Sequence, residues 1–397
     1  MDFALQKTLE LLLIIGLGVL LQKKLAKQDL NGIKTLILSV ALPATIFVAL
    51  LKIELKGTLL VFPLIALSFN LVMLFTSKYF LSTTLPTKEN AKKRTLLMLM
   101  PSSAPGLSCF PFIVAYLGED TLALAALADV GNKIFVLILL YLLAMHWYRK
   151  RALVDKNTSS KSKLVGLLRS LVNEPINMIM ALGLLLLGFG LNFSSLPTFL
   201  QGTVVSIKNL MTPLVLLFIG LAVRINKGEF KLIASMLLRR AGLAFLLSGS
   251  IAYMIPGLAT SMILLLVVFP QSACSFWPFA HMSAINAMEN KEGQPRPTFD
   301  IAFAVNVLAC SLPFSTALIL GVFSFSELFV LPANIIGIGL GILVVSYIPF
   351  LFKKISSYFN KKASLVDQGH EISNGKTQKL EPRTEAQAQA QAQAQAS

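Results

Sequence analysis

The chain has 397 residues, of which 55% are hydrophobic and only 14% are charged, with a formal net charge of +16. A soluble domain carries about 25% charged residues, whereas this sequence repeats apolar runs of about 20 residues, the length that crosses a bilayer. The composition therefore excludes an ordinary soluble globular domain. Three cysteines and three histidines are scattered without a disulfide, redox or metal-ligand spacing, so we expect neither a disulfide scaffold nor a metal site.

Hydropathy in chain order predicts eleven membrane-crossing helices. Loops on one side of them hold 30 of the 35 Lys and Arg residues. Because basic residues collect on cytoplasmic loops, we expect a multi-pass protein of the plasma (inner) membrane with its N-terminus outside and its C-terminus in the cytoplasm. The positive charge then requires no nucleic-acid partner. The predicted helices are 5–22, 35–52, 57–77, 95–117, 121–147, 175–193, 202–223, 232–256, 258–287, 299–322 and 328–352.

The two halves of the chain resemble each other at a nearly constant offset. Pro43 in the second helix and Pro213 in the seventh are 170 positions apart, and Pro101 in the fourth helix and Pro270 in the ninth are 169 apart. Five helices per copy place the second copy upside down in the membrane, an inverted repeat typical of secondary transporters. The fold class predicted is therefore an all-α membrane protein of two inverted five-helix repeats plus an eleventh helix.

Closely spaced prolines should unwind the fourth and ninth helices, because proline lacks an N–H donor and clashes with the preceding turn. Irregular backbone at membrane depth is tolerated only when it is buried in protein or lines a cavity. The helix N-termini beyond such breaks carry partial positive charge, which suits a carboxylate or another small anion. We take Pro101 and Pro270 as the crossover prolines, and expect substrate contacts from Ser102, Ser103, Pro105, Gly106, Gln271, Ser272 and Ser275.

The predicted fifth helix holds Asp129, Asn132 and Lys133 at membrane depth. The spacing of Asp129 and Lys133 allows an ion pair on one helix face, which is either a structural pair or a site for a coupling proton or cation. Asn306 in the tenth helix lies near the repeat equivalent of Asn132, so both asparagines are candidates for holding unwound backbone or substrate. Asn70 is expected to bond a neighbouring helix.

The remaining segments complete the predicted organisation. Residues 1–147 form the first repeat, 148–174 a cytoplasmic linker with an amphipathic interfacial helix, and 175–325 the second repeat. Residues 326–352 add the eleventh helix, and 353–397 form a polar, disordered cytoplasmic tail that ends in an Ala-Gln repeat.

Four segments carry a resemblance to a known family. They read ILSVALPATIFVALLK, GLSCFPFIVAYLGEDTLALAALADVGN, LMTPLVLLFIGLAV and FPQSACSFWPFAHMSAIN. In order and spacing, over residues 8–322, the sequence resembles the auxin efflux carrier family, which includes bacterial permeases and the plant PIN-FORMED proteins. The resemblance implies a scaffold domain and a crossover domain, with the substrate where the fourth and ninth helices cross, at Pro101–Gly106 and Pro270–Ser275. It also implies that Asp129 and Asn132 match the Asp and Asn of the family's fifth helix.

The resulting hypothesis is a secondary active transporter of a small organic anion, a carboxylate, that works by elevator-type alternating access. Asp129 would couple transport to H⁺ or Na⁺, or balance Lys133. The alternatives are a sodium-coupled symporter of the bile-acid-symporter type, whose sodium-site Glu and Asn cluster is not evident here, and a ligand sensor built on a transporter fold. No nucleophile–base or metal constellation appears, so we expect no enzyme and no cofactor other than a coupling ion. A homodimer remains open.

Overall fold

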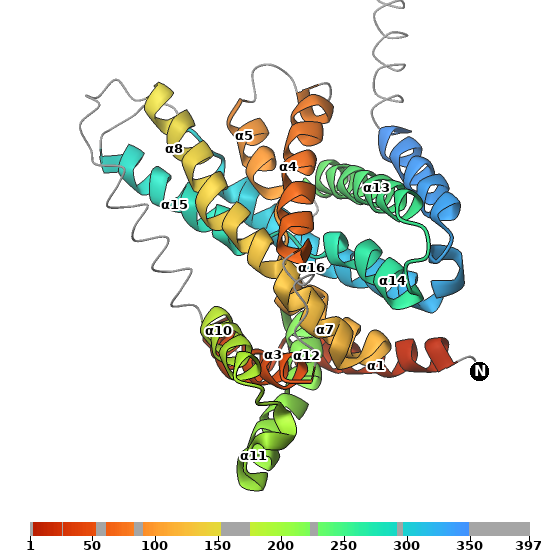
Figure 1. The fold of residues 1–397 in the computed structure, drawn as a ribbon. Coiled ribbons are helices and arrows are strands. Elements are labelled where there is room, and N and C mark those ends of the chain that lie inside the picture. The colour runs from red at the N-terminus through yellow and green to blue at the C-terminus, as the bar shows by residue number, and fades with distance from the viewer. Residues whose placement is uncertain are drawn as a thin grey trace, which may run out of the picture. The chain divides into compact units, whose positions relative to one another are not determined.

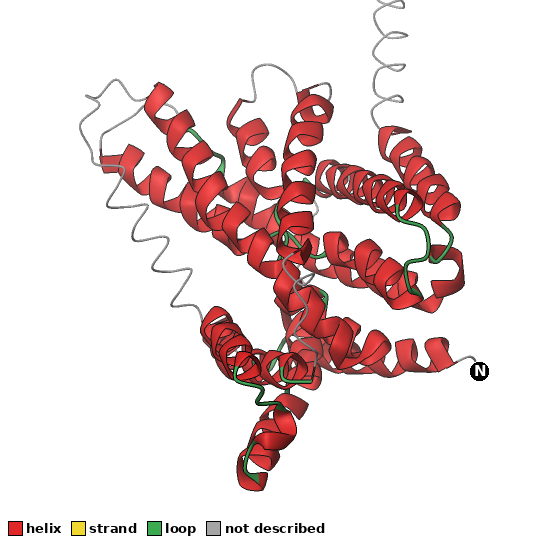
Figure 2. Ribbon diagram, in the orientation of Figure 1, coloured by secondary structure: helices red, strands yellow, loops and turns green. Residues whose placement is uncertain are grey.

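The computed structural model describes residues 3–25, 27–52, 61–82, 90–151, 175–222, 229–291 and 297–348. These residues form helices joined by short turns and loops, with no strand in the described ranges (Figures 1 and 2). The chain divides into two units, Met1–Ser346 and Tyr347–Ser397. The described residues lie almost entirely in the first unit. Most of the predicted linker, residues 152–174, and the predicted tail, residues 353–397, lie outside the described residues.

The described part contains six helical stretches that are long and apolar enough to cross a membrane. The prediction of an all-α protein built from apolar helices is confirmed at this level. The six stretches are Asp29–Leu50, Val61–Tyr79, Phe110–Arg151, Thr198–Ala222, Thr260–Asn290 and Ile301–Ser324, and two shorter apolar helices span Pro175–Gly188 and Pro332–Ile348.

The helices follow the predicted apolar segments in order. The first half comprises α1 (Phe3–Leu21), α2 (Lys27–Leu36), the π turn η1 (Ile37–Ala41), α3 (Leu42–Leu50), α4 (Val61–Ser82), α5 (Asn90–Leu99), α6 (Pro105–Ser108), α7 (Phe110–Ile134), the π turn η3 (Phe135–Leu139) and α8 (Leu140–Arg151). The second half comprises α10 (Pro175–Gly188), the 3-10 turn η4 (Phe193–Ser195), α11 (Thr198–Asn209), α12 (Met211–Ala222), α13 (Phe230–Met254), α14 (Thr260–Val268), the 3-10 turn η5 (Phe269–Gln271), α15 (Phe276–Lys291), α16 (Ile301–Ser324) and the 3-10 turn η6 (Ser326–Phe329).

Prolines explain where the predicted second and seventh helices depart from a regular α-helix. Pro43 follows the π turn η1, and Pro213 lies just after the interruption at Leu210 that separates α11 from α12. Proline cannot donate to the carbonyl four residues earlier, so the helix widens or breaks there. The two proline-containing segments pack against each other through α3 and α11. In addition, α3 contacts α10, and α12 contacts α1.

Glycines set the closest helix contacts. A Cβ atom on Gly220 of α12 would lie 2.1 Å from the Ile15 carbonyl oxygen of α1, and one on Gly131 of α7 would lie 1.9 Å from the Pro63 carbonyl oxygen of α4. Real side chains do not approach backbone this closely. The small residue is therefore what lets each pair of helices meet, as in other membrane helix pairs.

Candidate functional site

The two predicted helix breaks are present, and they bond to each other. Residues 100–104 separate α5 from α6, and residues 272–275 separate η5 from α15. The Ala104 N–H donates to the Ala273 carbonyl at 2.8 Å, and the Ser275 N–H donates to Ser102 Oγ at 3.0 Å. Ala104 precedes Pro105 and has φ −124° and ψ 68°, because a residue before proline avoids the α region.

Serine hydroxyls accept from the N–H groups of the second break. The Ala273 N–H donates to Ser108 Oγ at 2.9 Å, and the Cys274 N–H donates to Ser311 Oγ at 3.2 Å. With the bond from Ser275 to Ser102, three consecutive N–H groups have side-chain partners. An unpaired backbone group in an apolar interior is costly, so these serines stabilise the unwound segment. Ser108 and Ser311 were not predicted, although hydroxyls inside apolar runs are a detectable signal.

Arg240 and Asn132 donate to the carbonyls of the first break. Arg240 Nε donates to the Met100 carbonyl at 2.8 Å, and its Nη2 donates to the Ser102 carbonyl at 3.1 Å and to Ser103 Oγ at 3.3 Å. Asn132 Nδ2 donates to the Ser103 carbonyl at 2.9 Å. Asn132 therefore holds unwound backbone, which is one of the two roles proposed for it from the sequence.

A second set of contacts joins Asn132 to the charged residues of α7. Its Nδ2 also donates to Asp129 Oδ1 at 2.8 Å, and Asn70 of α4 donates to its Oδ1 at 2.9 Å. Lys133 Nζ lies 3.5 Å from Asp129 Oδ2 and donates to Asn177 Oδ1 of α10 at 3.1 Å. The predicted ion pair between Asp129 and Lys133 is confirmed, as is the interhelical bond expected of Asn70.

A cavity of about 380 Å³ opens beside the crossing. Part of its lining comes from the first break and from α7, and part from the second break and the start of α15. It brings together seven of the residues predicted from the sequence, which are Ser103, Pro105, Gly106, Asp129, Asn132, Lys133 and Ser275.

The other predicted contact residues do not line this cavity. Gln271 Nε2 donates to the Ala241 carbonyl of α13 at 3.1 Å, and Ser272 Oγ donates to the Phe269 carbonyl at 2.6 Å. Both side chains are buried and are used to hold backbone. Ser102 Oγ is engaged in the crossing itself. Of the crossover prolines, Pro101 is buried in the first break and Pro270 lines a separate, apolar cavity of about 110 Å³.

Asn306 is not at the crossing, which corrects the prediction made from its place in the repeat. Its Nδ2 donates to Glu229 Oε2 at 3.0 Å, just before α13, and Lys92 of α5 pairs with the other carboxylate oxygen at 3.0 Å. Burial raises the pKa of Glu229, but the bonds from Asn306 and Lys92 lower it more, so it lies below its ordinary value. The offset between Asn132 and Asn306 is 174 positions, about one helical turn out of register with the 170 of the prolines.

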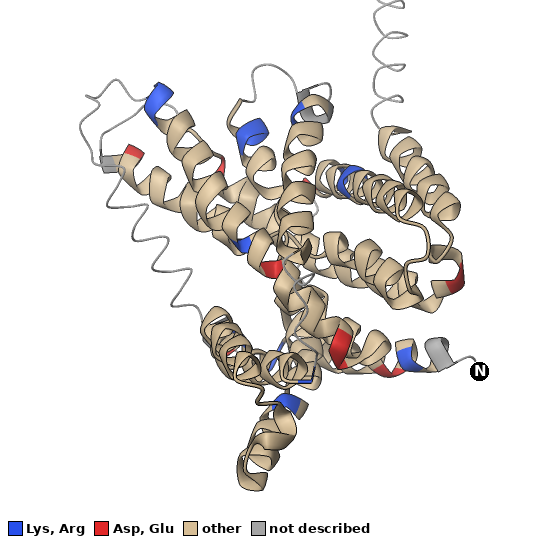
Figure 3. Ribbon diagram, in the orientation of Figure 1, with Lys and Arg blue, Asp and Glu red and all other residues tan. Residues whose placement is uncertain are grey.

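Two basic residues that the loop analysis assigned to the cytoplasmic side are buried inside a helix instead. Figure 3 shows a basic band within α13. Arg239 and Arg240 occupy the middle of this helix and are 3% and 4% exposed. The signal was available, because apolar residues flank both arginines and a charge inside such a segment marks a functional position by default. When these two residues are counted with the helix, the predicted cytoplasmic loops still hold most of the Lys and Arg residues.

Lys34 is a further cavity residue that sequence reasoning missed. Helix α2 begins at Lys27, earlier than predicted, and carries Lys34 to the cavity lining. Its Nζ lies 4.6 Å from the centre of the Phe276 ring, a cation–π distance. Phe276 and Trp277 also line the cavity.

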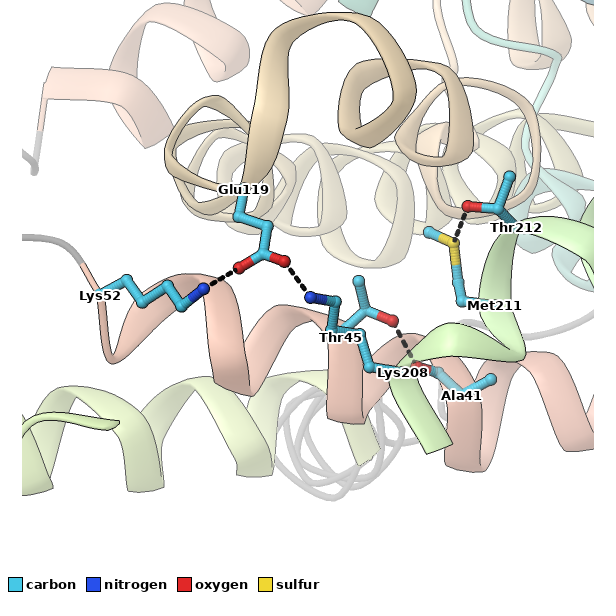
Figure 4. Close-up of polar contacts among 7 residues, drawn as sticks. All are labelled: Ala41, Thr45, Lys52, Glu119, Lys208, Met211 and Thr212. Carbon is cyan, nitrogen blue, oxygen red and sulfur yellow. Dashed lines mark hydrogen bonds and ion pairs between the residues drawn. The ribbon is translucent and has the colours of Figure 1, made fainter. Parts of the chain in front are cut away.

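A separate charged cluster lies where α7 kinks at Gly118, which has φ 84°. Glu119 lies between Lys52, at the end of α3, and Lys208, at the end of α11, and pairs with both (Figure 4). The Lys52 contact is 2.7 Å. Gly118 permits the left-handed conformation that separates the predicted fourth and fifth helices. Both lysines of this cluster thus share one carboxylate partner.

Comparison with known proteins does not assign this chain to a family: no protein-family model and no curated protein matches it.

Proposed function

We propose that this protein is a secondary transporter of a small organic anion and that the cavity beside the helix crossing is its substrate site. The observation that carries the proposal is a cavity lined by two lysines, Lys34 and Lys133, at the meeting point of two broken helices. Its volume falls in the range of about 300–1,000 Å³ that small-molecule sites occupy. Broken helices around a mid-membrane site are the usual construction of secondary transporters.

The charges of the lining favour an anion. Lys34 and Lys133 oppose a single carboxylate, Asp129, and the carboxylate is already paired with Lys133. Lys34 contacts the Phe276 ring, an interaction worth about 0.5–1 kcal/mol at exposed sites. A charge-assisted hydrogen bond is worth about 1.5–3 kcal/mol. A carboxylate that enters the cavity would therefore draw Lys34 away from the ring.

The packing supports an elevator-type movement as the transport step. Helices α1, α3, α10, α11 and α12 form a connected group, through contacts of α1 with α12, of α3 with α10 and α11, and of α11 with α12. The side chains that hold the breaks come from other helices, which are α6, α7, α13 and α16. The first group would serve as the scaffold and the crossing as the moving part. Asp129 would act as the coupling site, because its two oxygens contact Asn132 and Lys133, and protonation would weaken both contacts.

The test is ligand-induced stabilisation of the purified protein in detergent. We expect a carboxylate from a panel of mono- and dicarboxylates to raise the melting temperature in a dose-dependent way, while its uncharged amide analogue does not. Lys34→Gln should weaken the apparent affinity about tenfold, equivalent to about 1.4 kcal/mol. Lys208→Gln is the matched control, because Lys208 is paired with Glu119 away from the cavity, and it should bind normally.

Comparison of two pH values, with and without sodium, distinguishes the coupling ions. A carboxylate shift that depends on pH alone supports Asp129 as a proton site, and a shift that requires sodium favours the bile-acid-symporter-type alternative. If only uncharged ligands stabilise the protein, the cavity is not an anion site. The same conclusion follows if Lys34→Gln and Lys208→Gln bind the carboxylate with equal apparent affinity.

A further inference from the structure

We infer that Arg240 gives the substrate cavity its positive potential from behind the broken backbone, as a positioning residue that does not touch the substrate. The inference deepens the proposed function and rests on it. Arg240 is buried in α13 and makes all three of its hydrogen bonds to the first break, through Met100, Ser102 and Ser103. Of these residues, Ser103 lines the cavity and Arg240 does not.

The charge of Arg240 is balanced by neutral dipoles instead of a carboxylate. Its hydrogen-bond acceptors are two backbone carbonyls and a hydroxyl, and the ion pairs of the described residues do not include it. A buried cation without a counter-ion is costly. In a medium of low dielectric constant its field also reaches far beyond its hydrogen bonds. The adjoining cavity is therefore electropositive before any ligand enters.

The bonded carbonyls also orient the backbone of the first break. The described residues include no cis peptide bond, and a trans peptide points its N–H opposite to its carbonyl. Because the Ser102 carbonyl points to Arg240, the N–H of the same peptide, which belongs to Ser103, points away from it. The positive end of this dipole thus lies on the side remote from the guanidinium. Arg240 acts on an anion both through its own charge and through the peptide that it turns.

The pseudo-equivalent position in the first half carries no charge. Asn70 precedes Arg240 by 170 positions, the offset of Pro43 and Pro213, and it reaches the crossing only through Asn132. Asp129 and Lys133 beside it neutralise each other. Of the buried groups that hold the crossing, Arg240 is therefore the one that leaves a net charge there.

The neighbouring Arg239 is a matched control. It has the same side chain on the same helix and the same degree of burial, but it reaches the Ser346 carbonyl at 3.5 Å and neither lines the cavity nor bonds the breaks. A general effect of removing a buried arginine from α13 would appear in both variants. An effect on the cavity should appear only when Arg240 is changed.

The experiment measures the electrostatic potential of the cavity without requiring transport. Phe276, which lines the cavity and is 51% exposed, is replaced in a Phe276→Cys variant that lacks the native cysteines through Cys109→Ala, Cys274→Ala and Cys310→Ala. The labelling rate of this cysteine by anionic methanethiosulfonate ethylsulfonate is divided by its rate with cationic methanethiosulfonate ethyltrimethylammonium. We expect Arg240→Gln to lower this ratio about tenfold and Arg239→Gln to leave it within about twofold.

Arg240→Lys covers the case in which Arg240→Gln does not fold. Lysine keeps the charge but lacks the fork that bonds two carbonyls, so the ratio should stay near that of the parent. The inference is overturned if the labelling ratio is unchanged in Arg240→Gln, or if Arg239→Gln lowers the ratio as much as Arg240→Gln does. It is also overturned if Arg240→Lys lowers the ratio as much as Arg240→Gln does. A protein that binds no carboxylate but shows the expected ratios would refute the proposed function and leave the electrostatic role of Arg240 standing.

Discussion

Replacement of Asn132 by alanine tests whether the crossing is held by side chains, as the structure indicates. Asn132 is 1% exposed and takes part in three hydrogen bonds, with the Ser103 carbonyl at 2.9 Å, Asp129 Oδ1 at 2.8 Å and Asn70 Nδ2 at 2.9 Å. Asn132→Ala removes all three and leaves no group that can replace the amide. The Ser103 carbonyl, the Asp129 carboxylate and the Asn70 amide each lose a partner inside the protein.

The expected loss of stability follows from these bonds. Interhelical hydrogen bonds in membrane proteins average about 0.6 kcal/mol each, which sets a lower estimate of about 2 kcal/mol for three. If one of the three partners stays unsatisfied, at a further cost of about 1–3 kcal/mol, the upper estimate rises to about 5 kcal/mol. We expect the free energy of unfolding to fall by about 3 kcal/mol.

The assay is equilibrium unfolding by SDS in mixed micelles, followed by tryptophan fluorescence. Asn306→Ala is the control, since Asn306 is half-buried and donates one bond, to Glu229. We expect this variant to lose less than about 1 kcal/mol. If Asn132→Ala costs no more than Asn306→Ala, the stability of the crossing does not depend on Asn132, and the hydrogen bond from Asn132 to the Ser103 carbonyl does not hold the first break.

Two further predictions concern packing and pH. Gly131→Ala puts a Cβ atom 1.9 Å from the Pro63 carbonyl oxygen, so α4 and α7 must separate. We expect the free energy of unfolding in SDS to fall by more than about 3 kcal/mol. Gly202→Ala, whose Cβ meets nothing within 4 Å, should stabilise α11 by about 0.5–1 kcal/mol. Equal effects of the two substitutions would contradict the close approach. The lowered pKa of Glu229 means that its bonds add stability above the ordinary value of 4.5 and lose it as pH falls through the folded-state pKa. The melting temperature of the wild type should therefore exceed that of Glu229→Gln by a constant difference near neutral pH, and this difference should shrink below about pH 4.5. A difference that persists in acid would show that the charge of Glu229 is not responsible for it.

The candidate site was partly predictable because proline chemistry is local. Pro101 and Pro105 interrupt their helix whatever surrounds them, so the breaks could be placed from the residues alone. The pairing of Asp129 with Lys133 was equally accessible, since positions four apart share one face of a helix. Arg240 was missed because a basic pair near the expected start of a helix was assigned to the loop. Both arginines nevertheless fall inside the predicted helix 232–256, and α13, which begins at Phe230, places them near its middle and in the interior.

The contacts of the polar side chains required the tertiary structure. Gln271 ends η5 and Ser272 begins the second break, close to where their sequence positions indicate, but they bond backbone of α13 and η5 and do not line the cavity. Composition and periodicity determined that this is an all-α chain of apolar, membrane-length helices with two proline breaks, because hydropathy and proline geometry depend on residues close together in the chain. Only the tertiary structure decided that these breaks bond each other, that Lys34 reaches the cavity and that Arg240 lies behind the first break. Those contacts join residues up to about 240 positions apart, and their geometry depends on how whole helices pack.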